Sequence, residues 1–166
     1  MKPLTRRGVL AVAGVAFAAL LAGCSAHPGT AAVVDGRAIS QDYLDEAYED
    51  ANAQGIVIDK PTMLVLIIAA PYFVEAADEN GVGVSNGEAR EAAATLTEDA
   101  SRGFVEFLRL QLALQNLRNL PDGEGVIVEV DQRVRAIEMD INPRYGELNP
   151  ETAEIARPPL PWIVEG

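Results

Sequence analysis

The chain has few of the side chains on which most enzyme mechanisms depend. It contains one cysteine and one histidine in 166 residues, and only 5% of its residues are aromatic. The histidine, His27, lies in the small polar stretch Ser25–Thr30, which is typical of a flexible tether. The rest of the chain therefore has no histidine for a Ser-His-Asp or Cys-His system, and no usual zinc site. Carboxylate chemistry remains, with few aromatic rings to stack a sugar. We expect no enzyme and no cofactor.

Basic residues are scarce as well. Lys and Arg number 13 against 25 Asp and Glu, which gives a net charge of −12. Residues 1–23 hold three basic residues and no acidic one, so the chain without that segment carries −15. Such an acidic surface repels nucleic acid and anionic lipid headgroups alike. We therefore expect no nucleic-acid partner.

Long apolar runs are missing, but a short one follows the N-terminus. Lys2, Arg6 and Arg7 precede an apolar stretch from about Gly8 to Leu21, an arrangement typical of a secretory signal peptide. Leu21-Ala22-Gly23-Cys24 comes next and resembles a bacterial lipobox. The resemblance implies that Cys24 is lipid-modified and becomes the first residue of the mature chain. A buried cysteine in an N-terminal helix is the alternative, but 14 apolar residues are short for a bilayer span.

The export route stays open. Thr5-Arg6-Arg7-Gly8-Val9-Leu10 resembles a twin-arginine signal, although arginine pairs also occur in ordinary secretory signals. Either route predicts a protein attached to the membrane through a lipid at Cys24, on the extracytoplasmic face. We expect a signal peptide over 1–23, a tether over 24–30, one folded domain over 31–146 and a proline-rich tail over 147–166.

The first half of the domain is predicted to begin with strands and continue with helices. Ala31–Val34 is β-prone, Asp35-Gly36 indicates a turn, and Arg37–Ile39 is a candidate for a short second strand. Ser40 is a good N-cap for a helix that ends at Gly55. Pro61 and Thr62 begin a second helix, which ends at Asn80-Gly81. Pro71 should kink or divide that helix. The alternative for its apolar part is a buried strand over Leu64–Ile68.

The second half is less uniform. Ser85 and Glu88 form a capping-box pattern at the start of a helix that we expect to reach about Asp99. Ser101 begins another helix with two apolar stripes, which ends near Leu120. Val126–Val134 fits a helix or a strand equally well. Arg135–Ile141 alternates and predicts a strand with Ile137, Met139 and Ile141 directed inward, followed by a turn over Asn142–Gly146. The tail should be extended or disordered.

The expected fold class is mainly α, with four to five helices closed by a small β pairing between the N-terminal and C-terminal strands. This plan resembles the N-terminal domain of the SurA/PrsA/trigger-factor chaperone group. Residues 31–40 are similar to the opening "V-x-G-x-x-I-[ST]" strand and turn of that group, and Gly81–Ser85 to its "G-hydrophobic-x-V-S" step. Ile141–Gly146 resembles "V-N-P-R-Y/F-G". The interval between Leu120 and Arg135 is too short for the usual parvulin domain.

The resemblance implies a chaperone-like domain without an isomerase, whose partner is unfolded or exported polypeptide. Extended polypeptide would then lie in an apolar groove between helices. Our candidate groove residues, each of which also fits simple core packing, are Met63, Leu66, Tyr72, Phe73, Phe104, Phe107 and Leu108. The alternative is an accessory or structural lipoprotein that docks on one envelope complex through the tail and Trp162. A small-ligand-binding lipoprotein is a third hypothesis.

Overall fold

A computed structural model describes residues 28–149, 152 and 155–156. The described chain begins with strand β1 (Thr30–Val34), which pairs antiparallel with β2 (Arg37–Ser40). Asp35 and Gly36 join the two strands with φ angles of 48° and 76°. Positive φ at both central residues is the requirement of a type I′ turn, the turn that follows the twist of a hairpin. The predicted strand, turn and second strand are confirmed.

Helices α1 (Gln41–Ala53) and α2 (Lys60–Glu79) follow, each with a side-chain cap. The Ser40 hydroxyl accepts a hydrogen bond from Tyr43 N at 3.1 Å, as predicted, and Asp59 caps α2. The alternative of a strand over Leu64–Ile68 is wrong, because these residues lie inside α2. α2 also continues through Pro71, so the proline does not divide the helix. Residues of α2 pack into both core clusters, and this packing stabilises the helix at Pro71, where one backbone N–H is missing.

Helices α3 (Asn86–Ala94) and α4 (Arg102–Arg118) begin at the predicted caps. Ser85 and Glu88 form both hydrogen bonds of the capping box. α3 ends at Ala94 rather than near Asp99. The Thr95 hydroxyl donates to Ala92 O at 2.7 Å, and the next residue, Leu96, is 45% exposed. With little apolar surface to bury beyond Ala94, continued helix has no packing to stabilise it.

The last helix is α5 (Gly123–Arg135), which resolves the ambiguous segment in favour of a helix. Strand β3 (Met139–Ile141) is shorter than the predicted strand over 135–141, because α5 continues through Arg135. Met139 and Ile141 do face inward, and β3 pairs antiparallel with β1 in a sheet of order β2-β1-β3. The predicted pairing of the two ends of the domain is confirmed. Ile137 lies before the strand, packed against the core.

The described part of the tail contains two short strands that we did not predict. β4 (Glu147–Leu148) pairs antiparallel with β5 (Ile155–Ala156). Ile155 packs against the core, so the folded region extends past the predicted boundary at 146. Residues 157–166, with Trp162, lie outside the described residues, as do the signal peptide and Cys24. The prediction for the tail did not foresee this pairing, because two-residue strands leave almost no pattern in a sequence.

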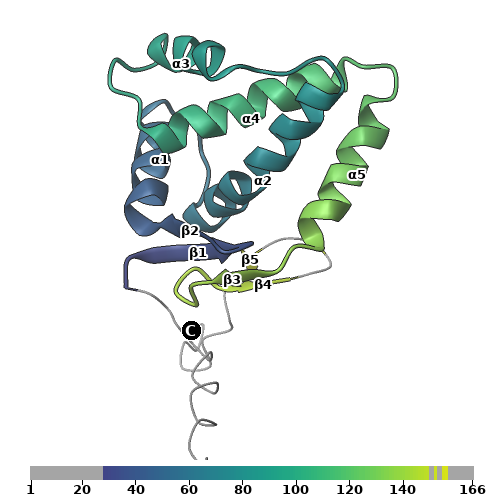
Figure 1. Cartoon of the computed structure of the whole chain (residues 1–166). Helices are drawn as coiled ribbons and strands as arrows, with labels where there is room; N and C mark the ends of the chain where they lie inside the picture. Colours follow the sequence, from purple (N-terminus) through teal and green to yellow (C-terminus); the bar gives the residue numbers. More distant parts are fainter. Residues whose placement is uncertain (1–27, 150–151, 153–154, 157–166) are drawn as a thin grey trace, which may run out of the picture.

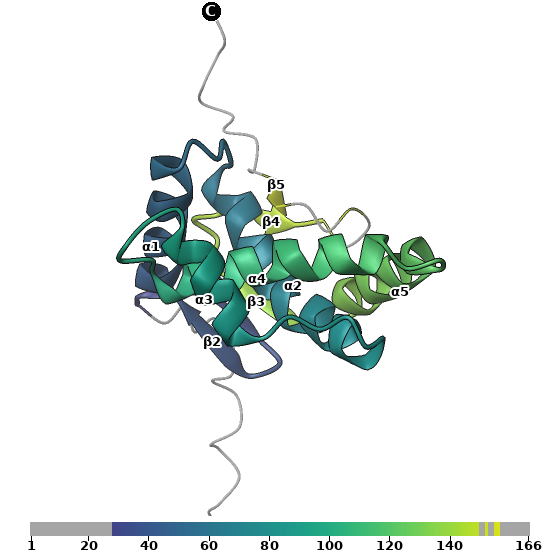
Figure 2. The same ribbon diagram turned by 90° about the horizontal axis from the view of Figure 1, so that it is seen from above.

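The core consists of two clusters that share α2. One lies between the sheet, α1 and the beginnings of α2 and α4, and the other between α2, α4 and α5. Figures 1 and 2 show α2 and α4 crossing at the centre, with the sheet below them and α3 on the far side of α4. Within the described residues, α2 is the one helix long and apolar enough to cross a membrane. Its most apolar window is 61% buried in the fold, as in a core helix.

Candidate functional site

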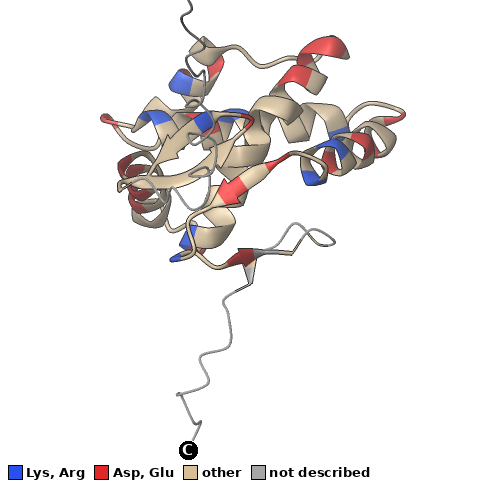
Figure 3. Cartoon of the chain, turned by 60° about the horizontal axis from the view of Figure 1, so that its bottom comes forward, with Lys and Arg blue, Asp and Glu red and all other residues tan. Residues whose placement is uncertain are grey.

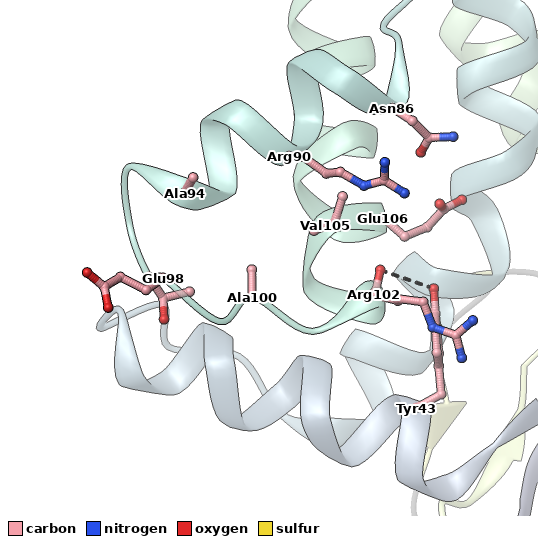
Figure 4. A pocket seen from close by; sticks show the side chains of 10 residues that line it. Tyr43, Asn86, Arg90, Ala94, Glu98, Ala100, Arg102, Val105 and Glu106 are labelled. Carbon is pink, nitrogen blue, oxygen red and sulfur yellow. Dashed lines mark hydrogen bonds between the residues drawn. The ribbon is translucent and has the colours of Figure 1, made fainter.

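A cavity of about 500 Å³ lies between α1, α3 and the beginning of α4 (Figure 4). The segment that joins α3 to α4 closes one end of it. The lining combines charged, amide and phenol groups with small apolar side chains. The lining residues are Tyr43, Asn86, Arg90, Ala94, Thr97, Glu98, Ala100, Arg102, Val105 and Glu106.

One wall of the cavity is formed where α4 begins against α1. Gly103 permits this contact, since a Cβ atom there would lie 2.7 Å from both Ala47 Cβ and Tyr43 O. The Tyr43 hydroxyl donates to Arg102 O at 3.4 Å, and Ser101 N donates to Asp50 Oδ2 at 2.8 Å. Because Gly103 has no side chain, α4 can lie close to α1, and Tyr43 and Arg102 lie side by side on this wall.

The opposite wall is α3, which is held mainly by α4. Ala89 and Ala93 are its two buried residues. The chain before α3 is fastened by Arg109 Nε, which donates to Val84 O at 2.7 Å, and by Asn116 Nδ2, which donates to Val82 O at 3.0 Å. Little apolar surface holds α3 itself, so its displacement costs less than that of α1 or α2.

Charged groups of both signs face this cavity. In Figure 4, Arg90, Arg102 and Glu106 point toward the same side, whereas Glu98 points outward. No ion pair or hydrogen bond of the described residues engages the guanidinium group of Arg90 or Arg102. Burial raises the pKa of the Tyr43 phenol. Glu106 adds to this increase, while the nearby arginines oppose it.

A second concave region of about 810 Å³ lies between the β1–β2 turn, α2 and α4. Tyr72 lines it and donates from its hydroxyl to Asp35 Oδ2 at 2.9 Å. Arg133 lies over the Tyr72 ring at 5.6 Å and pairs with Glu75 at 3.1 Å. These groups satisfy one another, so this region presents fewer free polar groups to a ligand than the first cavity.

The seven candidate groove residues do not form one groove. Met63, Phe73, Phe104 and Phe107 are between 0 and 8% exposed, and they belong to the two core clusters. The Phe104 and Phe107 rings stack at 6.1 Å inside the first cluster. The other three, Leu66, Tyr72 and Leu108, are half-buried. None of the seven lines the α1–α3–α4 cavity. The four buried residues are core, whereas a groove role for the other three stays a prediction.

Residues with a predicted role in export and lipidation lie outside the described residues. They are Arg6, Arg7, Leu21, Ala22, Gly23 and Cys24. The cavity residues were missed because they are charged or small, and such residues usually indicate ordinary surface. The one signal available was the scarcity of basic residues, which makes Arg90, an arginine with no carboxylate three or four residues away, worth noticing.

A serine motif also went unnoticed in the sequence. Gly83-Val84-Ser85-Asn86-Gly87 matches the Gly-x-Ser-x-Gly pattern of hydrolase nucleophile elbows. Here the serine is the N-cap of α3, with its hydroxyl bonded to Glu88 N at 3.2 Å, and no strand leads into it. The described residues contain no histidine to activate it. The serine therefore acts as a helix cap.

No cluster of His, Cys, Asp and Glu side chains within the described residues has the arrangement of a metal site. The cavity offers hydrogen-bond donors, acceptors and charges of both signs. Comparison with known proteins finds no matching family model, no similar curated protein and no similar solved structure. The fold and the cavity therefore define a mainly helical domain with a small antiparallel sheet and a cavity lined by polar and small side chains.

Proposed function

We propose that the chain is a lipid-anchored protein of the extracytoplasmic membrane face whose domain binds polypeptide without catalysis. The observation that carries the proposal is the α1–α3–α4 cavity, with its unengaged charges and its small side chains. The predicted anchor at Cys24 supplies the location. The apolar groove expected from the sequence is replaced by this polar cavity as the binding site.

The lining suits the chemistry of a polypeptide segment. An extended chain presents backbone N–H and C=O groups that lose their water when bound, and each needs a partner. Arg90, Arg102 and Asn86 offer donors, and Glu106 offers acceptor oxygens. Small side chains at Ala94 and Ala100 leave room for the side chains of the segment. A volume of about 500 Å³ lies within the range of ligand pockets.

The proposed anchor also limits how far the domain stands from the membrane. Six residue steps separate the predicted lipid site, Cys24, from Thr30 at the start of β1. Fully extended, they span at most about 20 Å. Such a short connection keeps the cavity close to the surface from which exported chains emerge.

Binding is tested with the full-length protein extracted in mild detergent, by its ability to prevent aggregation of a chemically unfolded test protein. Wild type should suppress aggregation at near-stoichiometric amounts. Ala94→Trp fills the cavity and should abolish suppression, while Ala38→Trp, at an exposed position on β2, should not. Circular dichroism confirms that each variant is folded.

Failure of folded wild type to suppress aggregation would contradict polypeptide binding as a general activity. Equal suppression by wild type and Ala94→Trp would leave the activity in place and remove it from this cavity. A single stoichiometric partner recovered from membranes would instead favour docking on one envelope complex.

A further inference from the structure

Two arginines at the α1–α3–α4 cavity differ from most basic side chains of the domain. Arg90 lies on α3, and Arg102 is the first residue of α4. Across residues 28–149, 152 and 155–156, no carboxylate lies within ion-pair distance of either guanidinium. Most other basic groups are engaged by a neighbouring oxygen, namely Lys60, Arg109, Arg133, Arg135 and Arg144.

The chain has nearly twice as many carboxylates as basic groups, so unpaired guanidinium groups are not explained by a shortage of partners. Both guanidinium groups line one cavity, so an anion bound there would be attracted by both. The N-termini of α3 and α4 border the same cavity and add partial positive charge. Together these groups would attract an anionic group, although the protein as a whole is acidic.

Glu106 limits how many negative charges a ligand can bring into the cavity. Its carboxylate points to the same side as Arg90 and Arg102, whereas Glu98 points outward (Figure 4). With Glu106 present, the two arginines leave one positive charge uncompensated at this side of the cavity. One carboxylate of a ligand would balance it, and a second would meet repulsion from Glu106.

We infer that the cavity selects a polypeptide segment bearing one carboxylate, which Arg90 and Arg102 receive together. Guanidinium groups bind carboxylates through paired N–H···O bonds with defined geometry, so they distinguish a carboxylate from a neutral amide of the same shape. This inference rests on the proposed function, because it names the class of segment that the same cavity takes.

The test measures fluorescence anisotropy of labelled peptides on the full-length protein in mild detergent. One peptide carries a single Glu and an amidated C-terminus, its isostere carries Gln, and a third carries Gln with a free C-terminal carboxylate. The Glu peptide should bind about tenfold more tightly than the fully neutral one. Tighter binding of the third peptide than of the fully neutral one would also support the inference, with the C-terminus as the source of the carboxylate.

Matched variants assign the effect to the cavity. Arg90→Gln and Arg102→Gln should each remove most of the preference for Glu over Gln. Arg118→Gln should not, since Arg118 lies sixteen residues along α4, about 24 Å away. Glu106→Gln should strengthen binding of the Glu peptide.

The outcomes separate the inference from the proposed function. Equal binding of all three peptides by wild type would overturn carboxylate selection while leaving polypeptide binding intact. Persistence of the preference in both arginine variants would overturn it as well. Failure of wild type to bind any peptide would overturn the proposed function itself.

Discussion

Asn142 joins the two ends of the domain with one side chain. Its Nδ2 donates to Thr30 O at 2.9 Å, and its Oδ1 accepts from Arg144 N at 3.1 Å. Its backbone N–H donates to Ala31 O at 2.9 Å. The turn after β3 is thereby tied to the first residues of β1, where the chain enters the fold. In an anchored protein this is the point at which the tether would pull.

Replacement of Asn142 by Ala should lower the free energy of unfolding by about 1–2 kcal/mol, because a half-buried bond between residues 30 and 142 is lost. Gln41 Nε2 also reaches Thr30 O, at 3.3 Å, so that carbonyl keeps a donor. Urea denaturation measures the change.

Asn52→Ala is the matched control for this bond. Asn52 Nδ2 also donates to a backbone carbonyl, Tyr48 O at 2.8 Å, but this bond is exposed and lies within α1. Its loss should change stability by less than about 0.5 kcal/mol. Equal effects of the two substitutions would show that the long-range bond has no special role.

The close contact between α1 and α4 depends on Gly103, which has no side chain. Gly103→Ala should destabilise the protein by about 1–3 kcal/mol, because the added methyl group meets Ala47 Cβ and the backbone oxygen of Tyr43. Separation of the two helices should also disturb the cavity, whose wall includes Tyr43 and Arg102. Chemical denaturation and the peptide assay report the two effects.

Gly87→Ala provides the opposite case in α3. A Cβ atom there meets only Ser85 Oγ, at an ordinary 3.6 Å, and alanine favours helix over glycine. Stability should rise by up to about 1 kcal/mol. A gain in stability at both glycines would contradict the close contact of α1 with α4.

Helix starts are the elements that the sequence predicted best. Ser40 and Ser85 were predicted as caps and Ser101 as the start of a helix, and each hydroxyl accepts a backbone N–H of its helix. The capping bonds also lower the pKa of Glu88, whose carboxylate accepts from Ser85 N. Because its folded pKa is depressed, this contribution to stability is present near neutral pH and is lost as the pH falls through that pKa.

Charge over the whole molecule bears on how the proposed attachment to a membrane would work. Acidic residues predominate over the described chain, while α5 carries both signs (Figure 3). Such a surface does not attract anionic lipid headgroups, so a lipid on Cys24 would have to supply the attachment.

Cys24→Ala should therefore remove labelled lipid from the protein and release the protein from the membrane fraction. His27→Ala, three residues away, should leave both unchanged. Metabolic labelling with a radioactive fatty acid, followed by fractionation, measures the two properties. Labelled lipid on Cys24→Ala, or none on the wild type, would contradict the anchor.

The sequence by itself determined the mainly helical class, the helix starts and the closing pair of strands, because caps, turn residues and alternation act over a few neighbouring residues. Only the tertiary structure decided that Val126–Val134 is helical, since Val130 and Val134 pack against α2 and α4. It also decided that Phe104 and Phe107 are core, while Arg90 and Arg102 share a cavity. Burial and cavities depend on which helix faces meet, and residues far apart along the chain make those contacts.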